Sequence, residues 1–409
     1  MRLLNNLLFV LFALSANAAD GTVGTVSVQK GNNVSVNGEA PLSLTLDGKD
    51  HQSCQFLSKR APDESHEFTW KEVTTTRGGE LAEILGAQLR SVDSLVVKGY
   101  VNDKDFHAMW DASLYGYLSV INLKNAVLEN NAVPDTAFFH ENEQYEGSSH
   151  EIFYYIGLRK IILPEGLEKI GEGAFYQASA LRQVNFPSTL RYIGDFAFNA
   201  TKLEMNQLVI PEGVEEINQY AFAFCRKLKA QVTLPSTIKK IGEWAFYGCP
   251  ITSINLPEGL ESLGSLAFWD CDLREVSIPS SCHEFNEGWQ FGFNRNLEKM
   301  HLPEGMTEIP DHFAVDCFRL REVNFPHTLK HIGEKAFSLC ISLKNVELPL
   351  GMQSLGEEAF SELEALEQIV FPASMKSLGK NSCSYWKNIK RIYCAAMEPP
   401  VCDPTDGGV

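Results

Sequence analysis

The stretch "LPEGLEKIGEGAF" occupies Leu163–Phe175, and close variants of it recur down the chain. The next three copies read "FPSTLRYIGDFAF", "IPEGVEEINQYAF" and "LPSTIKKIGEWAF". Each copy carries one proline, and the ten prolines follow one another at intervals of 22 to 24 residues: Pro164, Pro187, Pro211, Pro235, Pro257, Pro279, Pro303, Pro326, Pro349 and Pro372. A fixed period of this size predicts a solenoid, in which residues at equal offsets from the proline stack in columns.

Four apolar columns describe one coil: the residues one before, and three, six and eleven after the proline. The last column is Phe in seven of ten copies, so we expect Phe246 to be buried between Phe222 and Phe268. The segment before each proline reads Leu-x-x-Val-x-apolar, which predicts a short strand that the proline ends. A second short strand over segments such as "LEKIG" and a tight helical turn at "EGAFYQA" complete a β-rich repeat solenoid with short helical turns.

The position seven residues after the proline is Gly in seven copies, and Asn218, Asn286 and Pro310 in the others. Gly with Asn as its substitute predicts a backbone at positive φ. Pro310 cannot adopt that conformation, so its repeat must turn differently. In the same repeat Ala314 takes the Phe position, and the preceding copy, "HEFNEGWQFGF", is also irregular. Repeats six and seven are therefore where we expect a local bend.

Composition divides the rest of the chain. Residues 1–18 combine Arg2, an apolar run and "ANA", the three parts of a secretory signal peptide. Residues 19–68 read as a small β-rich segment, and residues 69–126 as a cap that covers the first coil. The repeats then span 127–402, with an acidic, tyrosine-rich insert at Phe139–Tyr155, and end in a tail, 403–409, that has the character of a truncation.

The charge balance limits the partners. Fifty-two acidic against 35 basic residues give a net charge of -17, which opposes phosphate backbones and excludes nucleic acid. No apolar segment after the leader is long enough for a transmembrane helix. We expect an exported monomer, at the cell surface or extracellular, without cofactor or metal.

Half of the ten cysteines lie fourteen residues after their proline: Cys225, Cys249, Cys271, Cys317 and Cys340. Buried thiols that act as small apolar residues account for this column, since disulfides between parallel side chains of stacked coils would have poor geometry. Cys394 and Cys402 lie outside the column and are the best candidates for a disulfide.

The ten copies of "LPxxLxxIGxxAFxxCxxLxxV" closely resemble the BspA-like leucine-rich repeats of bacterial surface proteins of the Bacteroidetes type, from about Val127 to Cys402. The segment from "LVVKGYVNDKDF" to "LSVINLKNA" resembles the lead-in that precedes such repeats. The resemblance implies an exported or cell-surface protein that binds other macromolecules, including host matrix components and other cells. This sequence departs from the family in two ways: no C-terminal anchoring or sorting domain is visible, and the chain stops at "CDPTDGGV", where such proteins usually add a final strand.

Catalytic motifs are missing from the sequence. Three His-Glu pairs occur, but none continues to H-E-x-x-H, and there is no G-x-S-x-G elbow or phosphate-binding glycine loop. His327 and His331 are four residues apart in a strand-and-turn context, which does not place them on one helical face. His140 and His150 with the glutamates of the insert could collect a cation, or belong to a plain protruding loop.

The strand before each proline offers a surface instead, because its residues two and four before the proline point outward. Amides and hydroxyls dominate these columns in the first half of the array, and the candidate ligand-binding residues are Gln183, Asn185, Gln207, Gln231, Thr233, Ser253 and Asn255. These side chains suit a protein or glycan ligand, or they form hydrogen-bonded ladders that only finish the sheet. The sequence therefore predicts a non-catalytic binding or adhesion module; the alternative is a secreted hydrolase or glycan-processing accessory protein with an unrecognised catalytic site.

Overall fold

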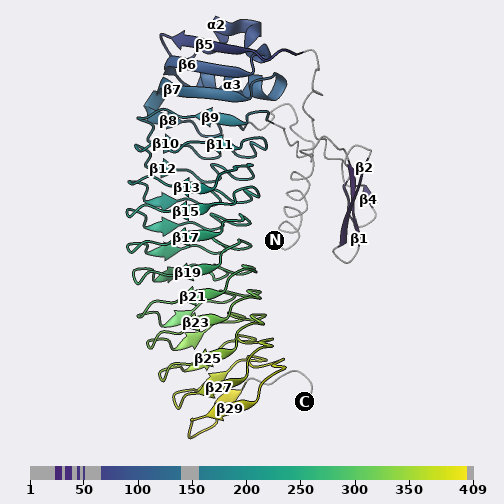
Figure 1. The fold of residues 1–409 in the computed structure, drawn as a ribbon, viewed down its shortest axis with the longest axis vertical. Helices are drawn as coiled ribbons and strands as arrows, with labels where there is room; N and C mark the ends of the chain where they lie inside the picture. The colour runs from purple at the N-terminus through teal and green to yellow at the C-terminus, as the bar shows by residue number, and fades with distance from the viewer. Residues whose placement is uncertain are drawn as a thin grey trace. The chain divides into compact units, whose positions relative to one another are not determined.

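The computed structural model describes four strands within residues 24–50, and then residues 66–139 and 156–402 (Figure 1). The chain divides into two compact units. Unit 1 comprises Met1–Pro187 and Phe196–Glu204, and unit 2 comprises Ser188–Asp195 and Met205–Val409. The expected leader, most of the expected insert and the tail lie outside the described residues.

Four strands lie in the segment expected to be β-rich: β1 (Gly24–Gln29), β2 (Asn33–Gly38), β3 (Leu44–Leu46) and β4 (Lys49–Asp50). They form one sheet in the order β2-β1-β3-β4. The β1–β2 and β3–β4 pairs are antiparallel, whereas β1 and β3 run parallel.

The expected cap folds as alternating strands and helices of unit 1. Its elements are β5 (Trp70–Thr75), α2 (Leu81–Leu85), the 3-10 helix η2 (Gly86–Ser91), β6 (Ser94–Val101), α3 (Asp103–Tyr115), β7 (Val120–Leu128) and the 3-10 helix η3 (Glu129–Asn131). The first coils add β8 (Ala132–Val133), β9 (Lys160–Ile162), β10 (Lys169–Ile170) and β11 (Gln183–Val184). The parallel sheet β11-β9-β7-β6-β5 joins the cap to the repeats.

A buried carboxylate holds the two cap helices together. Asp105 is 1% exposed and accepts backbone hydrogen bonds from Gly79 at 2.7 Å and Leu81 at 2.9 Å. It also accepts from the N–H of Asn102 at 3.0 Å, as part of a capping box at the start of α3. Because burying an unpaired charge is costly, these three donors are what permit Asp105 to lie in the core.

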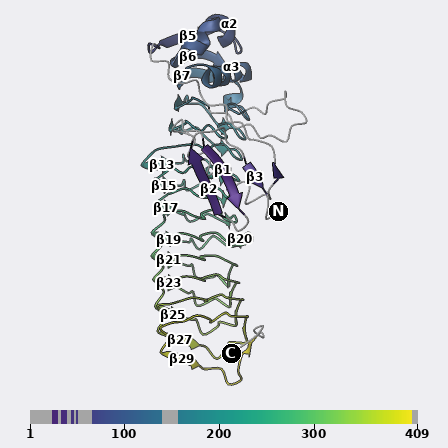
Figure 2. The same cartoon turned by 90° about the vertical axis from the view of Figure 1, so that its right-hand side faces the viewer.

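Unit 2 is a β-solenoid with two series of short parallel strands. The strands before the prolines form three sheets: β13 (Gln207–Val209), β15 (Gln231–Thr233) and β17 (Ser253–Asn255); β19 (Glu275–Ser277), β21 (Lys299–His301) and β23 (Glu322–Asn324); β25 (Asn345–Glu347), β27 (Gln368–Phe371) and β29 (Arg391–Cys394). The second series, in the expected position after the proline, is β12 (Tyr192–Ile193), β14 (Glu216–Ile217), β16 (Lys240–Ile241), β18 (Ser262–Leu263) and β20 (Glu284–Phe285), then β22 (Glu308–Ile309), β24 (His331–Ile332), β26 (Ser354–Leu355), β28 (Ser377–Leu378) and β30 (Val401–Cys402). Figure 2 shows the odd-numbered strands along one side of unit 2 and β20 on the other.

The segment around each Ala-Phe pair, expected as a helical turn, is a run of tight turns instead. Tyr247 N–H donates to the Trp244 carbonyl at 3.1 Å within the coil, while Phe222 N–H donates to the Ala245 carbonyl of the next coil at 2.9 Å. Tyr220 and Phe224, on either side of Phe222, have φ of 55° and 59°. Three residues without positive φ separate the two left-handed ones, and the backbone groups between them point along the solenoid axis rather than into a helix.

The expected phenylalanine spine is present in unit 2. Phe222, Phe246 and Phe268 are fully buried, and their rings stack with centroids 5.3 and 5.6 Å apart. The stack continues to Phe291, at 5.6 Å from Phe268. In the irregular seventh repeat, Ala314 holds the backbone position of the Phe column, since its N–H donates to Ala336 O, and the neighbouring Phe313 fills the core in its place.

The glycine column seven residues after the proline was expected at positive φ, and that prediction is wrong. None of Gly242, Gly264 or Gly356 is among the residues at positive φ. A Cβ on Gly264 would instead lie 2.4 Å from the backbone nitrogen of Glu243 in the preceding coil. The glycine is therefore required because adjacent coils approach too closely for a side chain.

The second strand series is interrupted between β20 and β22, in the repeats expected to be irregular. In regular coils the glycine of this column donates a ladder hydrogen bond, as Gly264 N–H does to Ile241 O at 2.8 Å. Pro310 occupies that position in the seventh repeat and has no N–H to donate. The irregularity thus comes from a lost hydrogen bond rather than from a forbidden φ.

The cysteine column is buried and its thiols are free, as expected. Their role is more specific than apolar packing. Cys249 Sγ donates to the carbonyl oxygen of Phe222 at 2.9 Å, and Cys340 Sγ donates to that of Ala314 at 3.3 Å, in each case the Phe position of the preceding coil. Asn294 replaces cysteine in this column and its side-chain amide donates to Phe268 O at 2.7 Å. The column therefore supplies hydrogen-bond donors that join successive coils.

Candidate functional site

The strand face of unit 2, defined here as the outward side of β13, β15 and β17, carries most of the predicted ligand-binding residues. Gln207, Gln231 and Ser253 are in register in one column, and Val209, Thr233 and Asn255 in the next. All six side chains are exposed, while the residue between each pair is buried. The outward orientation predicted for these residues is confirmed; ligand binding stays a prediction.

The polar side chains of this face are not committed to one another. Within the described part of the chain, no hydrogen bond engages the side chains of Gln207, Gln231, Thr233, Ser253 or Asn255. The alternative interpretation from the sequence, in which these side chains form hydrogen-bonded ladders with one another, therefore does not apply to this face. Each amide keeps both a donor and an acceptor for a ligand.

The two predicted site residues of unit 1 behave differently. Gln183 is exposed on β11, in register with Lys160 of β9. Asn185 is also exposed, but its side chain accepts from the N–H of Leu163 at 2.7 Å and donates to the Leu163 carbonyl at 3.0 Å. The Asn185 amide thus extends the strand ladder, as Asn324 does with Leu302 in unit 2.

The strand face is bordered by charged neighbours. On the following sheet, Lys299 pairs with Glu322 at 3.4 Å and His301 lies 3.4 Å from Glu275. These side chains occupy the same outward columns on β19, β21 and β23. The neutral strand face therefore ends where ion pairs begin.

The expected disulfide is not formed, because Cys394 and Cys402 are free and exposed. Cys394 lies on β29, which pairs with β27, whereas Cys402 lies on β30, which pairs with β28. The two thiols therefore belong to different strand series of the same coil.

The histidine pair of the eighth repeat, His327 and His331, does not converge on a site. His327 bonds with Glu304 at 3.0 Å, and His331 bonds with Ser354 Oγ at 2.7 Å. Among the described residues, no group of three or more potential ligands is placed to hold a metal ion. His140 and His150 lie outside these residues.

Sequence reasoning missed a second surface, which we call the aromatic edge of unit 2: Tyr220, Trp244, Trp269, Trp289 and Phe293. All five side chains are partly exposed and belong to the turns around the Ala-Phe pairs of four consecutive coils. The available signal was the pattern "QYAF", "EWAF", "AFWD" and "GWQFGF", in which an aromatic residue flanks the spine position.

Repeat coils that stack through parallel strands and a buried phenylalanine spine define a leucine-rich repeat solenoid. Residues 148–232, 229–330 and 309–397 match the family described as the BspA type leucine rich repeat region, in six copies. The chain belongs to this family, as the resemblance implied. No helix in the described residues has the length and apolar character needed to cross a membrane.

Three solved structures are similar to this chain, and the first of them, with a TM-score above 0.5, supports the fold. A leucine-rich repeat protein from Bacteroides ovatus is 20% identical, with a TM-score of 0.53 over 90% of this chain and 92% of its own. A leucine rich cell surface protein from Faecalibacterium prausnitzii is 18% identical, with a TM-score of 0.37 over 74% and 83%. The pneumococcal vaccine antigen PcpA is 18% identical, with a TM-score of 0.39 over 92% and 89%. Among curated proteins, none matches at a significant level.

Proposed function

We propose that this chain is an exported, non-catalytic binding module that holds an extracellular protein or glycan on the strand face of unit 2. One observation carries the proposal: the side chains of Gln207, Gln231, Thr233, Ser253 and Asn255 are exposed, in register and without a hydrogen bond to any residue that the structure describes. The strands fix their backbones about 4.8 Å apart, so little ordering is needed on binding.

The chemistry of the face favours a neutral, hydrogen-bonding ligand. Amides and hydroxyls donate and accept together, as glycan hydroxyls and peptide backbones require. The face carries no charged side chain, although the whole chain has a net charge of -17. Binding should therefore depend only weakly on ionic strength.

Placement outside the cell is part of the proposal. It rests on the leader-like residues 1–18 and on the resemblance of the repeats to those of bacterial surface proteins. If the strand face is displayed outside the cell, its ligand belongs to another cell or to a matrix, and binding it is adhesion.

The test is a screen of residues 19–409 against glycan and host-protein arrays, with recovery of every captured partner. The account expects capture with the partner intact. A partner returned cleaved would favour a hydrolase and overturn the non-catalytic assignment. The control for alanine substitutions on the strand face is the double variant Asn345→Ala with Gln368→Ala. Both residues are exposed in the same outward column, but on β25 and β27, outside the strand face. This variant should capture the partner as the parent chain does.

A further inference from the structure

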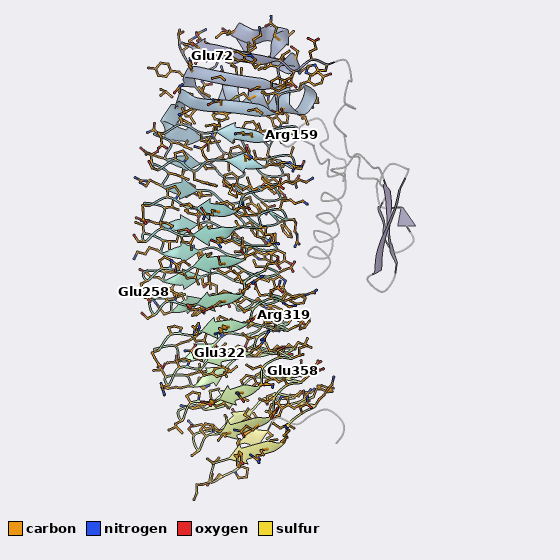
Figure 3. All side chains as sticks on the ribbon, in the orientation of Figure 1. Glu72, Arg159, Glu258, Arg319, Glu322 and Glu358 are labelled. Carbon is orange, nitrogen blue, oxygen red and sulfur yellow. The ribbon has the colours of Figure 1, made fainter. Side chains whose placement is uncertain are left out.

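The aromatic edge of unit 2 lies apart from the strand face. Figure 3 labels Glu358, which belongs to an Ala-Phe turn, and Glu258, which belongs to a Pro-Glu-Gly turn, at opposite edges of unit 2. Glu322 of β23, which belongs to the same strand series as the strand face, lies between these two edges in the same view. A ligand on the aromatic edge would therefore contact a different side of the coils.

The fold does not require aromatic residues at this edge. In each coil the residue two before the spine position has positive φ, and later coils place Lys335, Glu358 and Asn381 there at 50°, 51° and 53°. Tyr220, Trp244 and Trp289 adopt φ of 55°, 58° and 66° in the equivalent turns. Bulky side chains are disfavoured in this region, so the aromatic choice adds strain that a Gly or Asn would avoid.

The rings form two contacting groups. Tyr220 and Trp244 are parallel within 14°, with centroids 5.2 Å apart, a separation typical of offset stacking, and the ring of Tyr247 also contacts Trp244, with centroids 4.4 Å apart. Trp269 lies 5.2 Å from Trp289 at an angle of 58° and 4.5 Å from Phe293. The stack ends on His312, whose ring lies 3.7 Å from that of Trp289.

Hydrogen-bonding groups flank the rings. Arg226 pairs with Asp270 at 2.9 Å, and its guanidinium lies 5.6 Å from the Phe224 ring centre. Arg295 lies 5.7 Å from the centre of Phe293. Partly exposed rings and planar hydrogen-bond donors thus belong to the same turns.

We propose that the aromatic edge is a carbohydrate-binding site that takes an extended oligosaccharide. A pyranose ring has the same two-sided chemistry: its C–H face packs on aromatic rings, and its hydroxyls bond with guanidinium and carboxylate groups. Within each of the two groups, rings of neighbouring coils lie 5.2 Å apart, which suits a chain of sugars rather than a single one. This site is independent of the strand face.

The test uses the full mature chain and three soluble probes, cellohexaose, mannohexaose and chitohexaose, titrated by calorimetry. The test variants are Trp244→Asn and Trp289→Asn, because Asn381 shows that the turn accepts asparagine at this φ. Each should weaken the binding of a hexasaccharide at least tenfold while the melting temperature is kept or raised. Lys335→Asn, in the same column but outside the edge, should bind as the parent does.

Alanine at Gln207, Gln231 and Thr233 separates the two sites, because it should leave hexasaccharide binding unchanged. The proposal is overturned if none of the three probes binds the parent chain at millimolar concentration. It is also overturned if binding survives in both tryptophan variants, or if only protein partners depend on Trp244 and Trp289.

Discussion

Cys249 Sγ lies 2.9 Å from the carbonyl oxygen of Phe222 in the preceding coil, and it donates a hydrogen bond there. The same carbonyl also accepts the N–H of Cys225 from its own coil, at 3.2 Å. One buried oxygen thus receives a donor from each of two successive coils. Cysteine at this position is therefore a link in the solenoid as well as a small apolar residue.

Replacing this thiol separates the two roles. Cys249→Ala should lower the free energy of unfolding by about 1–3 kcal/mol, because it removes both a donor and packed volume. Cys249→Ser should cost less than Cys249→Ala, since the hydroxyl can donate to the same carbonyl. Urea unfolding measures the order of the two variants; serine worse than alanine would mean that the site needs only apolar volume.

Thiol reactivity should divide the cysteines into two classes. Burial raises the pKa of the Cys317 thiol to about 12 and holds that of Cys340 well above its usual range, so both stay protonated and unreactive at pH 8. A polar disulfide reagent should therefore label Cys394 and Cys402 in the native protein, and the column only in denaturant. Rapid native labelling of Cys225, Cys249 or Cys271 would contradict the buried column.

The same burial predicts loss of stability in alkali. Folding raises the pKa of the Cys317 thiol from 9.0 to about 12, and that of Tyr247 from 10.0 to about 12, chiefly by desolvation. Their contribution is complete below the pKa of the unfolded chain and is lost as the pH rises towards 12. The melting temperature should therefore fall between pH 9 and pH 12. Cys317→Ser should flatten this fall, and an unchanged pH profile would argue against a titrating thiol.

The phenylalanine spine sets how unfolding spreads. Phe246→Ala should cost about 3–5 kcal/mol, because it opens a cavity between Phe222 and Phe268. Since each coil contacts only its neighbours, melting should begin at this coil or split into two transitions. Calorimetry gives the transitions; a variant that melts like the parent would show that Phe246 is not a core residue.

The period and the columns could be predicted from sequence because stacked coils repeat their environment at equal offsets. Phe246, the outward Gln231 and Thr233, and the irregularity at Pro310 all followed from this register. The reason for the glycine column did not, because a need for positive φ and a lack of room for a Cβ both select glycine. The two causes are separated only by the structure, in which a Cβ on Gly264 would lie 2.4 Å from the backbone nitrogen of Glu243.

The aromatic edge and the thiol donors could not be predicted for a related reason. Trp244 shares its column with Lys335 and Glu358, so no residue type marks that column as special. Cysteine reads as a small apolar residue, and its carbonyl partner lies in another coil. In both cases the residue that explains the position, a contacting ring or an accepting carbonyl, lies in a neighbouring coil of the solenoid.

The most direct test of the central claim is capture of the partner found by the array screen, measured for the parent chain and for the triple variant Gln207→Ala, Gln231→Ala and Thr233→Ala. All three side chains are exposed, so each substitution should change the free energy of unfolding by no more than about 0.5 kcal/mol. We expect capture to fall at least tenfold while the fold is kept, because a few contacts dominate such interfaces. Undiminished capture by a variant that melts like the parent would contradict binding on the strand face.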